Sequence, residues 1–266
     1  IPPKLQFHPT IKRNNAMAQH VHSAACCSIP PIVSKGYKAK GEYKTIGGLN
    51  NYVTGPPTAT KALLYISDIF GYFEQSLQGA DILATSDKDN TYQVFMPDLF
   101  DGKPADISWY PPNTPEKGQK LGNFFKENAP DFAASRIRAL ITTYNESNPN
   151  IKIWGVVGFC WGGKIVSLTS GEGTPFKAAV EVHPAMVDPA DAEGITIPLA
   201  LLASKDEPAG DVKAFEARLK VEKHVETFGD QIHGFMAARS DLANERVKAE
   251  YERGYKTVLE FFAKHL

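Results

Sequence analysis

The segment with the most chemical content is Gly158–Gly162, Gly-Phe-Cys-Trp-Gly, which follows the apolar run Ile151–Val157. It has the form of the G-x-S-x-G motif with cysteine in place of serine. That motif places the nucleophile on a sharp strand-to-helix turn, where flanking glycines let backbone segments pass closely. The helix N-terminus would favour a thiolate at Cys160, and the backbone N–H of Trp161 would be free to bind an oxyanion. The pattern predicts a cysteine nucleophile; the alternative is a buried structural cysteine in a glycine-rich turn.

The partners of such a nucleophile are expected further along the chain, in the order nucleophile, acid, base. Asp206 follows the apolar run Pro198–Ala203, and His233 follows the predicted strand His224–Phe228. Both would lie on loops at the carboxyl edge of a sheet. We prefer Asp206 to its neighbour Glu207 by position, although Glu207 remains an alternative acid.

Of the seven histidines, only His233 has both the order and the location expected of the base. His183 ends another apolar run, Phe176–Val182. We predict that it supports the site or lines its pocket.

The elements that must position these residues alternate along the chain. Apolar runs typical of strands buried in a parallel sheet are Ala62–Ser67, Tyr92–Met96, Ile151–Val157, Phe176–Val182 and Pro198–Ala203, followed by the strand His224–Phe228. Helical patterns lie at Glu74–Thr85, Asp131–Asn145, Gly163–Thr169, Val212–Lys220 and Asn244–His265. Tyr43–Thr54 is expected to form an antiparallel hairpin. The alternation predicts an α/β fold with a mostly parallel, doubly wound sheet flanked by helices.

The length of 266 residues suits one large domain, which we place at 35–266. Residues 1–34 show no helical or strand period and are predicted to be a flexible tail. The stretch 101–130 is irregular and rich in proline, and we interpret it as a cap over the carboxyl edge of the sheet. An ordinary surface loop is the alternative.

The composition excludes several classes of protein. The formal net charge is −1 and no basic block dominates, so we expect no nucleic-acid partner and no membrane partner. The three cysteines, Cys26, Cys27 and Cys160, do not form a disulfide framework, which favours a reducing compartment and a cytoplasmic location. His20 and His22 lie near the paired cysteines, but this short run lacks a second ligand pair, so we expect no metal.

With these residues in place, the chain resembles the dienelactone hydrolase family of the α/β-hydrolase superfamily over about residues 43–266. The matching stretches are Asp68–Gly71, Met96–Phe100, Gly158–Gly163, Lys205-Asp206 and His233–Phe235. The resemblance implies a monomer or weak homodimer without cofactors, which opens a small-molecule lactone through a cysteinyl acyl intermediate. It also implies an oxyanion hole formed by the backbone N–H groups of Ile69 and Trp161.

Two departures from the family concern substrate and thiol control. Asp68 stands where the bacterial prototype has glutamate near the resting thiol, and it could instead cap the following helix. No arginine lies between Arg13 and Arg136, so an arginine clamp after the Pro97–Leu99 strand end is absent. Lys103 or Arg239 could bind the substrate anion instead. Phe70 belongs to the same candidate set for substrate binding, and the Trp161 side chain is expected to narrow the pocket.

The function predicted from the sequence is hydrolysis of a lactone or small ester by Cys160, assisted by His233 and Asp206. A thioester or glycan substrate on the same fold is one alternative. A non-catalytic relative or a redox sensor at Cys160 is another.

Overall fold

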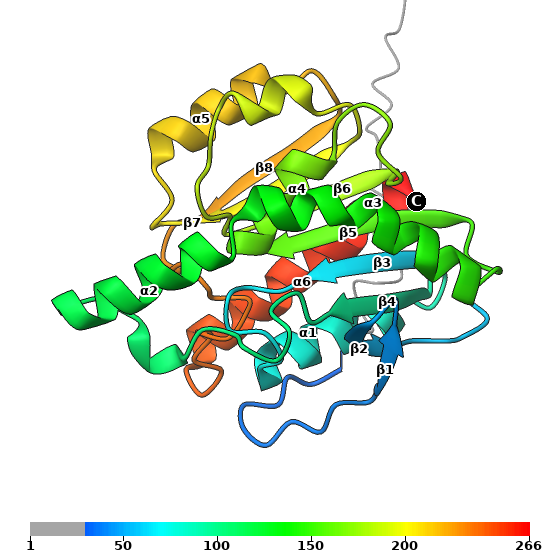
Figure 1. The fold of residues 1–266 in the computed structure, drawn as a ribbon, viewed down its shortest axis with the longest axis horizontal. Helices are drawn as coiled ribbons and strands as arrows, with labels where there is room; N and C mark the ends of the chain where they lie inside the picture. Colours follow the sequence, from blue (N-terminus) through cyan, green and yellow to red (C-terminus); the bar gives the residue numbers. More distant parts are fainter. Residues whose placement is uncertain (1–29) are drawn as a thin grey trace, which may run out of the picture.

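The structure is a computed structural model that describes residues 30–266. Eight strands form one twisted sheet (Figure 1) in the order β1-β2-β4-β3-β5-β6-β7-β8. The strands are β1 (Glu42–Ile46), β2 (Leu49–Thr54), β3 (Lys61–Ile66), β4 (Tyr92–Pro97), β5 (Ile153–Phe159), β6 (Ala178–Val182), β7 (Leu199–Ser204) and β8 (Lys223–Phe228). Only β2 runs antiparallel to its neighbours β1 and β4. The parallel strands β3 to β7 carry almost entirely buried side chains, as expected for a sheet covered on both faces.

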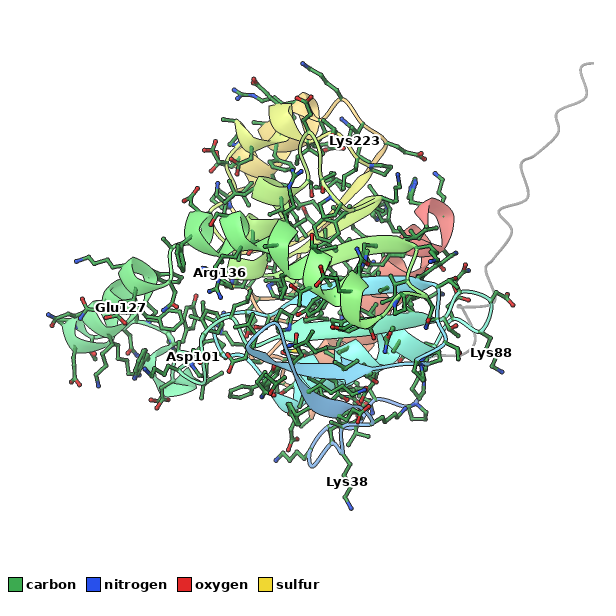
Figure 2. All side chains as sticks on the ribbon, turned by 45° about the vertical axis from the view of Figure 1, so that its right-hand side comes forward. Lys38, Lys88, Asp101, Glu127, Arg136 and Lys223 are labelled. Atoms are coloured by element: carbon green, nitrogen blue, oxygen red, sulfur yellow. The ribbon has the colours of Figure 1, made fainter. Side chains whose placement is uncertain are left out.

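Helices cover both faces of this sheet. The helices are α1 (Glu74–Thr85), α2 (Pro115–Glu127), α3 (Pro130–Ser147), α4 (Trp161–Thr169), α5 (Ala209–Arg218) and α6 (Glu245–His265), with 3-10 turns at Ile107–Trp109 and Asp191–Gly194. One hydrophobic cluster joins the sheet to α2, α3, α4 and α5, and a second joins it to α1 and α6. Figure 2 shows labelled charged side chains such as Lys38, Lys88 and Lys223 at the periphery of the molecule. The predicted α/β fold is confirmed, with element ends that differ by a few residues from the sequence prediction.

The stretch predicted to be irregular contains a helix. Thr114 caps α2 by accepting a hydrogen bond from the Lys117 backbone N–H, and Pro115 occupies the first turn. Leu121 and Phe124 form the buried stripe of this helix, which extends from the body of the molecule in Figure 1. The prediction that 101–130 lacks regular structure is therefore wrong for this half of the stretch.

The first described residues are attached to α1. Ile32 is buried, and the Val33 backbone exchanges two hydrogen bonds with the Gln78 side chain, at 2.7 and 3.0 Å. Residues 32 and 33 thus belong to the fold, and the predicted tail extends too far at its end. His20, His22, Cys26 and Cys27 lie outside the described residues. Among the described helices, none is long and apolar enough to cross a membrane.

Candidate active site

Cys160 lies between the last residue of β5 and the first residue of α4 with a strained backbone. Its φ of 54° and ψ of −114° are rare for a residue with a side chain. The parallel strand and the following helix impose this conformation, because the chain must reverse direction within one residue. The turn aims the thiol into a pocket at the carboxyl edge of the sheet, where Cys160 is among the lining residues.

Both glycines of the motif are required, because a side chain at either position would collide with neighbouring backbone atoms. A Cβ at Gly158 would lie 2.1 Å from the carbonyl oxygen of Gly162, and a Cβ at Gly162 would lie 2.3 Å from the carbonyl oxygen of Ile66. Both distances are far below contact, and the obstructing atoms are backbone. The predicted strand–turn–helix around Cys160 is therefore present, together with the steric reason for its glycine spacing.

The structure differs from the sequence prediction at the acid that faces His233. The Nδ1 atom of His233 lies 2.6 Å from Oε1 of Glu207, whose side chain is 2% exposed. Asp206 instead accepts a hydrogen bond from the His233 backbone N–H at 2.8 Å. The prediction that Asp206 holds the imidazole is thus wrong for this contact. The physical reason is the turn after β7, where Glu207 folds back to accept the Ser204 backbone N–H while Asp206 stays exposed.

The surroundings of His233 favour its protonated form. Burial by itself lowers the pKa of this imidazole, but the charge and hydrogen bond of Cys160 and those of Glu207 raise it well above the ordinary value. An imidazolium between a carboxylate and a sulfur is the arrangement expected for a thiolate–imidazolium pair. Such a pair can attack a carbonyl carbon and return the proton to a leaving group.

Asp68 lies in the same pocket as a buried carboxylate. Its Oδ1 accepts the Phe70 backbone N–H at 3.0 Å, and its Oδ2 accepts the Ala238 backbone N–H at 3.1 Å. Asp68 does not cap α1, which begins six residues later after Phe73. Burial raises its pKa from 3.8 to about 6, against the opposing effects of these two hydrogen bonds and of His233 and Arg239.

This raised pKa predicts a pH-dependent stability difference between wild type and Asp68→Asn. Ionising Asp68 costs more in the folded protein than in the unfolded chain, so its contribution to stability falls as the pH rises from about 4 to 6. Between pH 4 and pH 7, the unfolding free energy of wild type should fall by about 2 kcal/mol relative to that of the variant. Urea unfolding of both proteins at the two pH values measures this change. A difference that stays constant with pH would contradict the raised pKa.

Two backbone N–H groups near Cys160, those of Ile69 and Trp161, are not used in the hydrogen bonds of helices or strands. The Asp68 carboxylate accepts a hydrogen bond from the Phe70 N–H, and the Asp68 carbonyl accepts one from the Gly71 N–H. The Ile69 N–H between them has no acceptor among residues 30–266. Trp161 is the first residue of α4, so its N–H has no partner within the helix. Ile69 lines the same pocket as Cys160.

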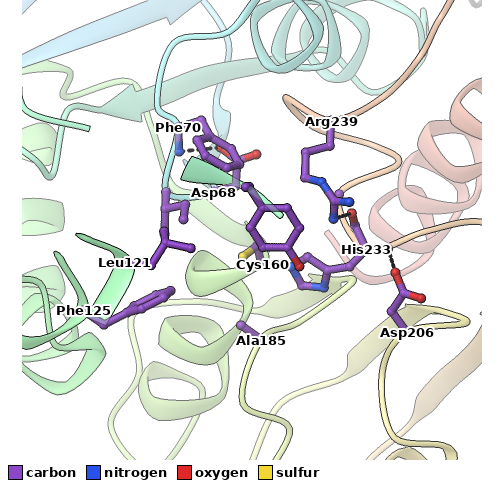
Figure 3. Close-up of a pocket in the computed structure, with 12 residues that line it drawn as sticks. Asp68, Phe70, Leu121, Phe125, Cys160, Ala185, Asp206, His233 and Arg239 are labelled. Atoms are coloured by element: carbon purple, nitrogen blue, oxygen red, sulfur yellow. Dashed lines mark hydrogen bonds between the residues drawn. The ribbon is translucent and has the colours of Figure 1, made fainter. Parts of the chain in front are cut away.

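The pocket has a volume of about 260 Å³ and a mostly apolar wall (Figure 3). It is lined by Asp68, Ile69, Phe70, Tyr110, Leu121, Phe125, Cys160, Ala185, Asp206, His233, Gly234 and Arg239. In the view of Figure 3, Leu121 and Phe125 of α2 lie on the side opposite Arg239. The interpretation of 101–130 as a cap is supported, because Tyr110 and α2 contribute to this wall. Sequence reasoning missed Tyr110, Leu121, Phe125 and Ala185 as lining residues.

Among the residues that the structure describes, Arg239 is the only arginine or lysine in this lining. Its guanidinium lies 4.1 Å above the centre of the Tyr110 ring and donates a hydrogen bond to the His233 carbonyl. No carboxylate forms an ion pair with it within the described part of the chain, although Asp68 lies near enough to feel its charge. The guanidinium is therefore available to an anionic group in the pocket.

Lys103 and the Trp161 side chain lie elsewhere than predicted, whereas His183 takes one of its two predicted places, beside the pocket rather than in its lining. Lys103 is exposed and does not line the pocket. His183 is completely buried, so it cannot contact a substrate. The Trp161 side chain does not narrow the pocket, because its indole is buried and donates a hydrogen bond to the Asn128 carbonyl at 2.9 Å. This contact fixes the junction between α2 and α3. Among residues 30–266, no group of three or more metal-ligating side chains is present.

Comparison with known proteins identifies the family. Residues 49–266 match the dienelactone hydrolase family. This chain belongs to that family. It is 35% identical to an uncharacterised AIM2 family protein of Schizosaccharomyces pombe, over 90% of this chain and 98% of the relative. It is 27% identical to the human carboxymethylenebutenolidase homolog, over 86% of this chain and 93% of the relative.

Solved structures of this family share the fold. A putative dienelactone hydrolase from Klebsiella pneumoniae superposes with a TM-score of 0.67 at 18% identity, covering 85% of this chain and 98% of that one. The dienelactone hydrolase from Anabaena variabilis superposes with a TM-score of 0.58 at 15% identity, covering 86% and 98%. The resemblance inferred from the motifs is confirmed at the level of family and fold.

Proposed function

We propose that this dienelactone-hydrolase-family chain cleaves a lactone or small ester through a covalent acyl intermediate on Cys160. The thiolate attacks the carbonyl carbon, and the backbone N–H groups of Ile69 and Trp161 bind the oxyanion. His233 gives its proton to the leaving alkoxide and later takes one from the attacking water. Glu207 holds the imidazole in the required tautomer, and Asp206 holds the His233 backbone. The observation that carries the proposal is the Cys160–His233–Glu207 chain at a strained elbow that opens into the pocket.

The walls of the pocket support a small, largely apolar acyl group with one anionic substituent. Phe70, Leu121 and Phe125 offer apolar contact, whereas Arg239 offers a planar guanidinium without a carboxylate partner in the described chain. The volume of about 260 Å³ favours a compact substrate over a polymer. A lactone or aryl ester that carries a carboxylate fits this combination.

Trapping of the acyl intermediate tests the proposal. Full-length protein is mixed with activated aryl esters and lactones at low pH, quenched within seconds, and digested for mass spectrometry. We expect the acyl mass on the peptide that contains Cys160, and its loss in Cys160→Ala. Turnover of these substrates without any adduct at Cys160, or with an adduct elsewhere, would contradict the covalent mechanism.

Arg239→Gln should reduce the preference for an anionic substrate. A charge-assisted hydrogen bond contributes about 1.5 to 3 kcal/mol, so the kcat/KM ratio between a carboxylate-bearing ester and its neutral carboxamide analogue should fall about tenfold to a hundredfold. The ratio isolates recognition of charge from the contacts of Arg239 with Tyr110 and the His233 carbonyl. Lys103→Gln is the matched control, since it also removes one cation but at an exposed position outside the pocket. Equal effects of the two variants would refute the assignment.

A further inference from the structure

His183 is a fully buried residue whose backbone conformation and unpaired ring nitrogens both reduce the stability of the fold. It has a φ of 36°, and neither ring nitrogen has a hydrogen-bond partner among the described residues. Burial lowers the pKa of His183 well below its ordinary value, and the charges of His233 and Arg239 lower it further, so the ring is neutral. A buried unpaired donor and a left-handed backbone each cost free energy. Apolar packing alone does not explain a histidine at this position.

The turn that contains His183 holds the backbone of Cys160 from both sides. The Cys160 N–H donates to the carbonyl of Val182 at 3.1 Å, and the Ala185 N–H donates to the carbonyl of Cys160 at 2.9 Å. The left-handed conformation of His183 lies between these two bonds and reverses the chain after β6. The strained backbone of Cys160 is therefore fixed by the turn at His183.

The ring of His183 contacts the other proposed catalytic residue. Its centroid lies 5.1 Å from that of His233 at an interplanar angle of 62°, an edge-to-face contact. The ring centroids of Phe159 and Phe235 each lie 5.8 Å from that of His183, so the imidazole packs among aromatic side chains. A neutral aromatic ring beside an imidazolium is favourable, whereas a second cation would be repelled.

We propose that His183 is a positioning residue that fixes Cys160 and His233 relative to each other. Its turn holds the backbone of Cys160, and its neutral ring supports the His233 imidazolium. The inference rests on the proposed function, because it assigns His183 to that thiolate–imidazolium pair. The charged or titratable groups that face His183 are His233 and Arg239, and those that face His233 include Cys160, Glu207 and Asp68.

The test compares His183→Leu with His183→Phe. Both replacements place an ordinary side chain on the same left-handed backbone and remove the unpaired nitrogens, but only phenylalanine keeps an aromatic face. Alkylation of Cys160 by iodoacetamide is followed across pH 4 to 9 by mass spectrometry of its peptide, so Cys26 and Cys27 do not interfere. For His183→Leu we expect the midpoint of the profile to rise by about 0.5 to 1 pH unit. We expect kcat/KM to fall about tenfold to a hundredfold. His183→Phe should remain close to wild type in both measurements.

Phe215→Leu is the control for a loss of core packing, because Phe215 is fully buried in α5 away from the pocket. It should lower the melting temperature without moving the alkylation profile. An unchanged profile in folded His183→Leu, or an equal shift in His183→Phe, would overturn the inference. If His183→Leu does not fold, His183→Asn, which tolerates a left-handed backbone, is measured in the same way. Failure of the proposed function is distinguishable, because wild type itself would then show no reactive thiolate at Cys160.

Discussion

Cys160→Ala should abolish hydrolysis of every ester and lactone that the wild-type protein cleaves. Removal of a nucleophile from an acyl-transfer triad lowers kcat by a factor on the order of 10⁴ or more, because no other group forms the covalent intermediate. The residual rate would come from oxyanion binding and proximity alone. Steady-state kinetics with the most active lactone or aryl ester measures the loss.

Cys160→Ser and a double replacement of Cys26 and Cys27 by alanine are the matched controls. The serine variant retains size and fold, but a hydroxyl is far less acidic than a thiol, so it should lose most turnover. The double variant keeps the proposed nucleophile and should retain the wild-type rate. Hydrolysis that survives in Cys160→Ala, or that disappears when Cys26 and Cys27 are replaced, would show that the reaction takes place elsewhere.

The residues that could be predicted from sequence are those fixed by local sterics and chain order. The glycine spacing around Cys160 reports backbone contacts that admit no side chain, so the turn can be inferred without a structure. His233 follows from its place after the last strand of a parallel sheet, whose carboxyl ends all meet at one edge. Neither inference depends on side-chain conformations.

The cap over the pocket was expected, but the helix α2 within it was not, although its sequence signals are present. Thr114 and Pro115 are a typical helix start, and Leu121, Phe124 and Phe125 have helical spacing. Pro111 and Pro112, just before this helix start, favour irregular structure and so obscure the helical pattern that follows. Which side of α2 lines the pocket depends on packing against the body of the molecule, and that packing is not local information.

The orientation of Trp161 and the contact of His183 could not be predicted for the same reason. Trp161 adjoins Cys160 in sequence, which suggested a place in the pocket, and His183 ends a predicted strand at the same sheet edge, which left open whether it supports the site or lines the pocket. The indole of Trp161 instead reaches the carbonyl of Asn128, 33 residues away. The ring of His183 is fully buried and makes an edge-to-face contact with His233. Long-range partners decide both orientations.

The choice between Asp206 and Glu207 depends on one residue of offset in a turn. Chain order places both carboxylates on the loop after β7, and only their side-chain directions distinguish them. The buried Ser204 N–H attracts Glu207, and the carboxylate that turns inward for it also meets the imidazole. Asp206 instead accepts a hydrogen bond from the His233 backbone N–H. The pair therefore provides a matched experiment on adjacent residues.

Glu207→Gln should lower kcat by about 10³- to 10⁴-fold, because an amide neither stabilises the imidazolium nor enforces the required tautomer. Loss of the carboxylate also removes one of the effects that raise the pKa of His233, so alkylation of Cys160 should require higher pH. Asp206→Asn should cost less than about tenfold, because its remaining oxygen still accepts the His233 backbone N–H, and its alkylation profile should match wild type. Circular dichroism and melting temperatures confirm that both variants are folded. A larger loss of kcat in Asp206→Asn than in Glu207→Gln would identify Asp206 as the catalytic acid, as expected from the sequence. The contact between Glu207 and His233 would then be structural.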